Sequence, residues 1–211
     1  MRLKVSFLLV FFALAVPVEV PALQTDDVIS GLESRYSKIA SISADFSQRA
    51  FMPGAASSEE SSGKLYLKKP GRIKWVYSKG SQDIIVSNGK TLWVYQAEFN
   101  QVIETSASIP MAGGAAFDLL TGAAKLRSDF SIAVKEKSSA GWVIELTPKE
   151  PAGFKRAEIT AGRDYLITKS IVEDNIGNSI EVNYSNIKTD PAIEDSIFEF
   201  TPPKGATVLK N

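Results

Sequence analysis

The chain has 211 residues, room for one ordinary domain, and it contains neither histidine nor cysteine. The missing cysteine excludes disulfides, thiolate metal sites and a lipid-modified N-terminal cysteine, and the missing histidine excludes the Ser-His-Asp triad and almost every catalytic zinc site. Because 24 basic residues balance 24 acidic ones, no overall field attracts nucleic acid. We therefore expect a folded protein without a metal, a cofactor or a nucleic-acid partner.

The N-terminus has the residue order of a signal peptide. Arg2 and Lys4 precede an uncharged apolar run at residues 5–18, and small residues up to Ala22 suit a signal peptidase. The run is shorter than the ~20 residues that a membrane-spanning helix needs. We expect residues 1–22 to be a removable leader, the alternative being a buried N-terminal helix.

The remaining chain, residues 23–211, reads as a single domain. It contains no second run that could span a membrane, no linker and no internal repeat. A leader on a chain without disulfides is typical of a bacterial periplasmic protein, and we expect that location.

One helix is predicted at the start of this domain. The Thr-Asp-Asp sequence at residues 25–27 is a good helix N-cap with acids in the first turn. Apolar residues then recur at helical spacing up to Ile39, so one face of the helix is expected to be buried.

Beyond Ser41 the apolar period changes to two, which is typical of strands. The Asn88-Gly89 pair is a strong hairpin turn between the apolar runs that flank it, and Lys69-Pro70-Gly71 marks another turn. The strands expected downstream lie at residues 100–105, 130–136, 142–147, 156–161, 165–174, 179–184 and 197–201.

About ten or eleven strands with one main helix predict a mainly β, α+β fold. The expected architecture is a curved antiparallel sheet or incomplete barrel.

Several strands are apolar on both faces, whereas a sheet with one wet face should alternate. Residues 84–86, 92–95 and 142–144 show this pattern. It fits an ordinary two-layer core or, alternatively, a barrel interior lined for an apolar ligand.

The segment at residues 109–126 is apolar and rich in glycine and alanine. A short helix there would place Phe117 and Leu120 on one side, between flexible glycine joints. The segment is either an ordinary buried helix and loop or a short helical lid over the mouth of the barrel.

Catalysis has little support, and we expect no enzyme. A paired-carboxylate hydrolase needs two acids converging in a cleft, and solvated charges on strand faces explain the acids more simply. The sequence lacks a phosphate-binding glycine loop and an acidic calcium loop. The candidate carboxylates are Asp45, Glu104, Asp118, Glu145 and Asp174.

Four segments together resemble the LolA family of outer-membrane lipoprotein carrier proteins. Residues 63–75 (GKLYLKKPGRIKW) resemble its strand–KP/RP–strand signature, and residues 85–95 (IVSNGKTLWVY) its (V/I)SDGKTLW-x-Y hairpin, with Asn for the usual Asp. Residues 198–206 (FEFTPPKGA) are similar to its C-terminal ending, and residues 44–48 (ADFSQ) to its opening. The likeness runs in family order over the whole chain after the leader.

The resemblance implies an incomplete antiparallel barrel with an apolar interior, closed by helices. It implies a periplasmic chaperone, expected to be a monomer, whose cargo is lipoproteins destined for the outer membrane. The implied partners are an inner-membrane ABC transporter complex, which supplies the lipoproteins, and an outer-membrane receptor, which takes them. The alternative is a lipid-binding or lipoprotein-sensing module of the same fold without a carrier role.

The resemblance also suggests site residues. An arginine that holds the lid helices in the family corresponds here to Lys69, which lacks the planar guanidinium fork. The family's lid segment corresponds to Phe117, Leu119 and Leu120. The residues expected to line the apolar cavity are Phe46, Ile73, Trp75, Tyr77, Trp93 and Tyr95.

Overall fold

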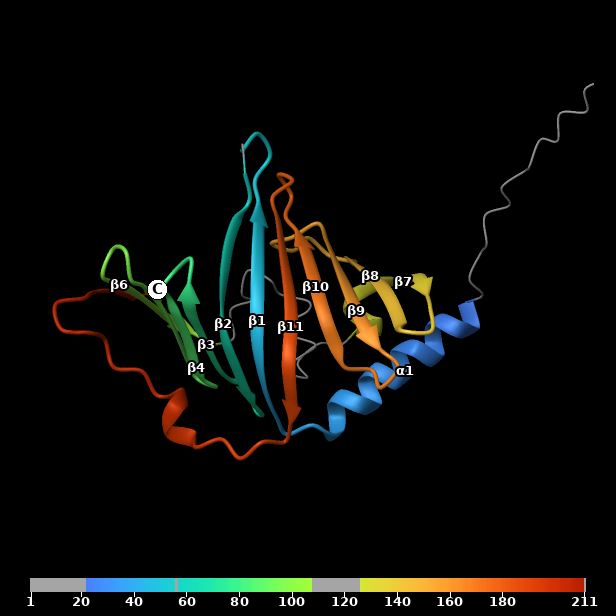
Figure 1. The fold of residues 1–211 in the computed structure, drawn as a ribbon, viewed down its shortest axis with the longest axis horizontal. Helices are drawn as coiled ribbons and strands as arrows, with labels where there is room; N and C mark the ends of the chain where they lie inside the picture. The colour runs from blue at the N-terminus through green and yellow to red at the C-terminus, as the bar shows by residue number, and fades with distance from the viewer. Residues whose placement is uncertain (1–21, 56, 108–125, 211) are drawn as a thin grey trace, which may run out of the picture.

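The computed structural model describes residues 22–55, 57–107 and 126–210. In this part of the chain, one sheet contains twelve strands in the order β12-β6-β5-β4-β3-β2-β1-β11-β10-β9-β8-β7 (Figure 1). The strands are β1 Ser41–Phe51, β2 Glu59–Lys68, β3 Arg72–Lys79, β4 Ile84–Asn88, β5 Thr91–Gln96, β6 Gln101–Ser106, β7 Phe130–Lys137, β8 Gly141–Pro148, β9 Arg156–Gly162, β10 Ile167–Glu173, β11 Ser179–Thr189 and β12 Thr207–Lys210. The helical elements are α1 Ala22–Lys38, α3 Leu126–Asp129 and the 3-10 helix η1 Asp195–Phe198.

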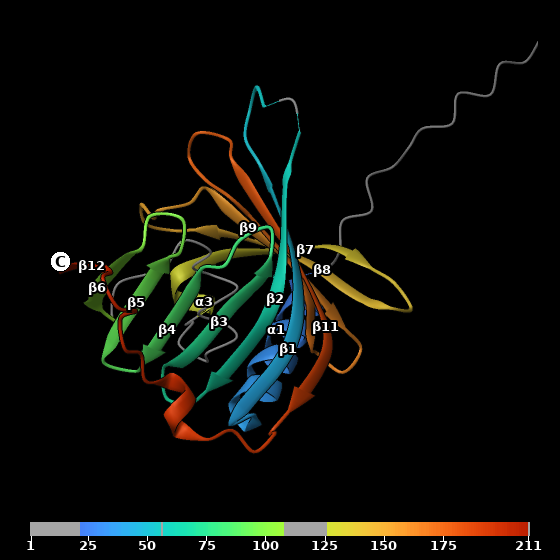
Figure 2. The ribbon, with the colours of Figure 1, turned by 60° about the vertical axis from the view of Figure 1, so that its left-hand side comes forward.

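The sheet curves strongly and stays open, because its outermost strands, β7 and β12, do not pair with each other in the described residues (Figure 2). Neighbouring strands are antiparallel except β12, which runs parallel to β6. The predicted incomplete barrel is thus confirmed. The strand count exceeds the prediction, and the short, exposed β12 carries no strand pattern that would have indicated it.

Helix α1 packs on the inner face of the sheet, as its apolar stripe predicted. Its side chains Ile29, Leu32 and Tyr36 are buried in the core that they form with β7–β10. The Tyr36 hydroxyl accepts a hydrogen bond of 3.0 Å from the backbone N–H of Ile167, which fixes the helix to the start of β10. No described helix is long and apolar enough to cross a membrane.

The outer face of β3–β5 is covered by the C-terminal strap, which we define as residues 190–206 (Figure 1). Phe198 of the strap is fully buried. Phe200 packs on the face of β5 that points away from the core, beside Trp93. Asp195 anchors the strap through ion pairs of 2.6 Å to Lys68 and 2.5 Å to Arg72. Strands β4 and β5 are apolar on both faces, and the strap packs against the face that points away from the core.

The strand predicted at residues 197–201 is wrong. The chain forms the 3-10 helix η1 there, and its φ and ψ turn extended only after Phe198. Prolines at 191, 202 and 203 bracket this region, and a proline cannot donate to a sheet ladder. The alternation of Phe198 and Phe200 is typical of one face of a strand. In the structure each ring instead packs separately between the strap and the sheet.

Candidate functional site

An aromatic cluster lies at the centre of the inner face, on β1, β3 and β11. The ring of Phe46 lies 4.5 Å from Trp75 and 5.1 Å from Tyr77, measured between centroids. Trp75 also lies 6.4 Å from Tyr184. Tilted and edge-to-face geometries at these distances are favourable between aromatic rings. The cluster is therefore a continuous apolar part of the inner face, built from strands that are far apart in sequence, and its Phe46 and Trp75 rings are buried.

The sheet register explains why these rings meet. Residues directly opposite each other on paired strands point to the same face. Phe46 is opposite Tyr184 on β11 and opposite Gly63 on β2, which is in turn opposite Tyr77. A Cβ atom at Gly63 would lie 3.0 Å from the Phe46 ring and 1.9 Å from the carbonyl oxygen of Val76. The absent side chain at Gly63 lets the rings on β1 and β3 approach across β2.

The two phenol hydroxyls of the cluster are hydrogen-bonded and uncharged, whereas the buried indole N–H of Trp75 has no hydrogen-bond partner among the described residues. The Tyr77 hydroxyl donates a 2.9 Å hydrogen bond to Gln48 Oε1, and the Tyr184 hydroxyl lies 3.1 Å from Ser170 Oγ. Burial raises the pKa of Tyr184 to about 12, and burial also raises the pKa of Tyr77. Both phenols are therefore neutral at physiological pH, so the cluster offers apolar surface without a charge.

Further apolar side chains extend this surface towards β6. Ile85 is opposite Trp75, Val94 is opposite Ile85, and Ile103 is opposite Val94. All three are half-buried, in contrast to Ile144 and Ile159 under α1, which are fully buried. On the β3–β6 side, the inner face therefore has apolar side chains that are only partly buried.

Lys69 lies at the turn between β2 and β3, next to the last turn of α1. Its ammonium Nζ donates a hydrogen bond to the carbonyl oxygen of Tyr36. Burial lowers the pKa of Lys69, and the charge of Asp190 opposes that effect. A cation at a helix C-terminus complements the partial negative charge of the unpaired carbonyls. Lys69 thus ties the β2–β3 turn to α1.

The predicted lining residues do not all share one face. Phe46, Trp75 and Tyr77 form the inner cluster, and Ile73 is buried on the same face of β3. Trp93 and Tyr95 point to the outer face, with ring centroids 6.3 Å and 6.2 Å from Phe200 of the strap.

The predicted lid residues Phe117, Leu119 and Leu120 lie outside the described residues. Tyr184, a member of the cluster, was missed. Its strand was predicted, but no sequence signal indicates that β11 pairs with β1.

The candidate carboxylates that lie in the described residues do not converge in a cleft. Asp45 pairs with Lys64 at 2.7 Å, and Glu104 pairs with Lys210 at 3.0 Å. Asp118 lies outside the described residues. Within the described ranges, no group of three or more acidic side chains could hold a metal ion.

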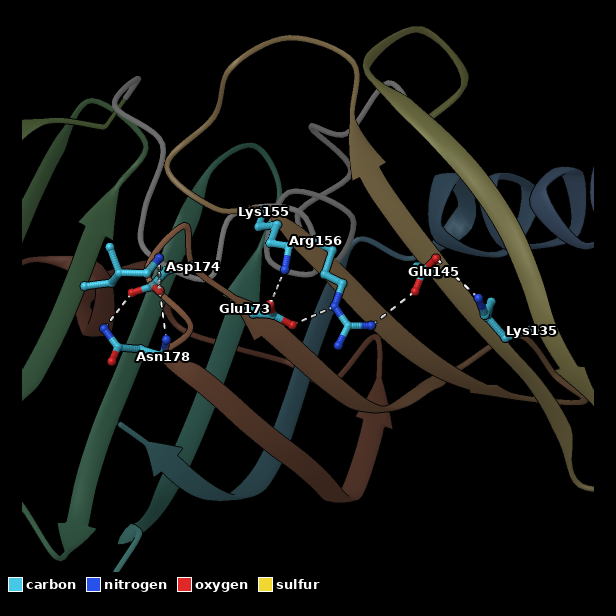
Figure 3. Close-up of polar contacts among 8 residues, drawn as sticks. Lys135, Glu145, Lys155, Arg156, Glu173, Asp174 and Asn178 are labelled. Carbon is cyan, nitrogen blue, oxygen red and sulfur yellow. Dashed lines mark hydrogen bonds and ion pairs between the residues drawn. The ribbon is translucent and has the colours of Figure 1, made fainter. Parts of the chain in front are cut away.

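Of the remaining two carboxylates, Glu145 lies on β8 and Asp174 lies in the turn after β10 (Figure 3). Glu145 pairs with Arg156 at 3.2 Å, and Arg156 pairs in turn with Glu173 at 2.6 Å. Asp174 closes the following turn by accepting hydrogen bonds from Asn178. Glu145 thus takes part in ion pairs on the sheet, and Asp174 stabilises a turn. This agrees with the expectation of solvated charges rather than a hydrolase site.

A family model described as outer membrane lipoprotein carrier protein LolA matches residues 37–201. A protein of Methylococcus capsulatus named outer-membrane lipoprotein carrier protein is 30% identical over 184 residues, which cover 86% of this chain and 87% of that protein. A protein of the same name from Legionella pneumophila (strain Lens) is 29% identical over 180 residues, covering 85% of this chain and 88% of that protein. Among solved structures, an uncharacterized conserved protein from Thermus thermophilus shares the fold, with a TM-score of 0.57 and 12% identity over 89% of this chain and 99% of that chain. On the match to the family model and these relatives, the chain belongs to the LolA family of outer membrane lipoprotein carrier proteins.

Proposed function

We propose that this protein binds the acyl chains of lipoproteins on its inner face and carries them across the periplasm. In this proposal an ABC transporter complex of the inner membrane supplies the cargo, and a receptor at the outer membrane takes it. The observation that carries the proposal is the neutral aromatic cluster on the inner face, in a chain whose relatives are named lipoprotein carriers.

The energetics of the cargo require such a surface. Each buried methylene is worth ~0.8 kcal/mol, so a sixteen-carbon chain left in water costs on the order of 12 kcal/mol. A carrier must offset much of this cost with apolar contact and without charged groups, since an unpaired buried charge is expensive. Phe46, Ile73, Trp75 and Tyr77 are the lining residues that we propose, together with Tyr184.

Release without an energy source at the outer membrane requires moderate affinity. We propose that the segment at residues 109–126 acts as a lid, with Phe117, Leu119 and Leu120 competing with acyl chains for the inner face. Closure of such a lid lowers the net affinity for cargo by the free energy of the closed state. Lys69 has a supporting part, because it ties the β2–β3 turn to α1 beside the proposed cavity.

The proposal also includes the leader. Residues 1–22 direct export, and the domain that remains works in the periplasm. Sequencing the N-terminus of the protein recovered from a periplasmic extract tests this step. We expect the mature chain to begin at Leu23, and a chain that retains Met1 in that extract would contradict the leader.

The experiment that tests the function is release of a lipoprotein from inner-membrane vesicles that contain the transporter. Added protein should bring the lipoprotein into the soluble fraction as a one-to-one complex in the presence of ATP. The matched variant is Trp75→Ser, which places a hydroxyl in the aromatic cluster and should reduce the released amount. Binding of free fatty acids without any release of lipoprotein would favour the lipid-binding module instead.

A further inference from the structure

Two neighbouring hairpins project from one end of the sheet (Figures 1 and 2). Both carry exposed apolar side chains at their tips. We define the paired tips as residues 51–55, between β1 and β2, and residues 174–178, between β10 and β11. The exposed fractions are 43% for Phe51, 48% for Met52 and 80% for Ile176. Single exposed apolar side chains are common on soluble proteins, whereas a group of them marks a contact surface, and three gather here.

The two tips lie side by side and are held in place. Phe51 is paired with Ser179 in the β1–β11 ladder, and a Cβ atom at Gly177 would lie 3.3 Å from Pro53. In the second tip, Asp174 Oδ1 accepts backbone hydrogen bonds of 2.9 Å from Ile176 and from Asn178. The turn therefore presents Ile176 outwards in a fixed conformation.

Charge is absent from the first tip, and the second tip carries one charged side chain, Asp174, at its base. The sequence from residue 50 to residue 58 has no charged side chain. Below it, Arg49 and Glu60 cancel in an ion pair of 2.8 Å, whereas Glu59 has no ion pair among the described residues. The first tip and Ile176 can enter the headgroup region without desolvating a charge, because the Asp174 carboxylate stays at the base of its turn, bound to backbone N–H groups. The negative charges of Asp174 and Glu59 disfavour an anionic surface.

From this arrangement we propose that the paired tips insert into the interfacial region of a bilayer whose lipids have no net charge. The tips are convex, and a fluid bilayer accepts a convex apolar end without a matching recess. Residues of the inner face continue from the aromatic cluster up to the tips, since Gln48 is opposite Val182 and Ala50 is opposite Ile180. Contact at the tips would place this end of the inner face next to the membrane. The use of that contact for cargo transfer rests on the proposed carrier function.

The test is flotation of the purified protein with phosphatidylcholine vesicles in a density gradient. We expect the wild-type protein to float, and to float less with vesicles that contain phosphatidylglycerol. The triple variant Phe51→Ser, Met52→Ser, Ile176→Ser should lose about tenfold in partition, which corresponds to about 1.4 kcal/mol. Because these side chains are exposed, the variant should unfold at the same urea concentration as the wild type.

The matched control is Phe99→Ser, which removes another exposed aromatic ring, 67% exposed, from the β5–β6 turn. It should float like the wild type, because it does not belong to the tips. Failure of the wild-type protein to float with phosphatidylcholine would overturn the proposal. That result is also the one expected if the tips contact a protein and not a membrane. Equal flotation of the triple variant, or equal loss in the control, would overturn it as well.

The same preparations, added to the lipoprotein-release assay, separate this proposal from the carrier function. Release of lipoprotein by a protein that never floats would leave the carrier function standing and overturn the membrane contact. Flotation that depends on the tips, without release of lipoprotein, would support the contact and contradict the carrier function.

Discussion

At the scale of single residues, Gly63 sets the spacing of the aromatic cluster. Its missing side chain leaves the space in which the Phe46 and Tyr77 rings meet, and the Val76 carbonyl fills the rest. Gly63→Ala should lower the free energy of unfolding by about 2 kcal/mol or more, because strand backbone has to move. Urea denaturation measures this change. Gly153→Ala is the control, with no atom within 4 Å of the added Cβ, and it should stay within about 1 kcal/mol of wild type.

Lys69 stands at the position where the resemblance to the LolA family implies an arginine. Lys69→Leu removes the hydrogen bond to the Tyr36 carbonyl and should lower the free energy of unfolding by about 1 kcal/mol. It should also change the rates of lipoprotein uptake and release, whereas Lys69→Arg retains a donor and should preserve both. Unchanged uptake and release in Lys69→Leu would contradict the role that we propose for this side chain.

At the scale of elements, the strap and the ion pairs of β8–β10 stabilise different parts of the sheet. Phe198→Ala should cost about 3–5 kcal/mol, because this fully buried ring fixes the strap to the outer face of β3 and β4. Thermal unfolding followed by circular dichroism measures the loss. Phe99→Ala, at an exposed turn, should leave the transition unchanged, and equal effects of the two substitutions would show that the strap does not stabilise the sheet.

The carboxylate of Glu173 predicts part of the acid sensitivity. Lys155 and then Arg156 hold the pKa of Glu173 below its usual range through hydrogen bonds and charge. A lowered pKa in the folded state contributes stability above the unfolded pKa of about 4.3, and that contribution is lost as the pH falls through the folded value. Glu173→Gln should therefore flatten the decline in urea midpoint below about pH 4.5, since the unfolded carboxyl titrates in that range.

The matched control for this pH series is Glu136→Gln, an exposed carboxylate on β7 that has no ion pair among the described residues. Its acid limb should follow that of the wild type. A parallel shift of both variants would assign the effect to net charge rather than to the Glu173 ion pairs.

At the scale of the whole molecule, the sequence predicted the fold class well and the site only in part. Strand periodicity and the Asn88-Gly89 turn were sufficient for a curved antiparallel sheet, because they are local signals. The long β11 was predicted to end at residue 184, whereas it ends at Thr189 because β1 continues to pair with it. Pairing between distant strands leaves no local trace in a sequence.

The same reason explains the split among the predicted lining residues. Alternation shows which residues of one strand share a face, so Ile73, Trp75 and Tyr77 were grouped correctly on β3. It does not show which face of β5 turns inwards when both are apolar, and so Trp93 and Tyr95 were grouped with them. The strap that makes the outer face apolar is itself irregular, and its packing depends on tertiary contacts of Phe198 and Phe200.

The pairing of β1 with β11 has a consequence for how the chain acquires its structure. The first strand of the sheet finds one of its two partners only near the end of the chain, and β6 is capped by β12, which is later still. Contacts of such long sequence separation slow folding and prevent an N-terminal part from completing the sheet alone. A truncated chain that ends before Ser179 should remain unfolded, so this domain becomes native only after almost all of its residues are available together.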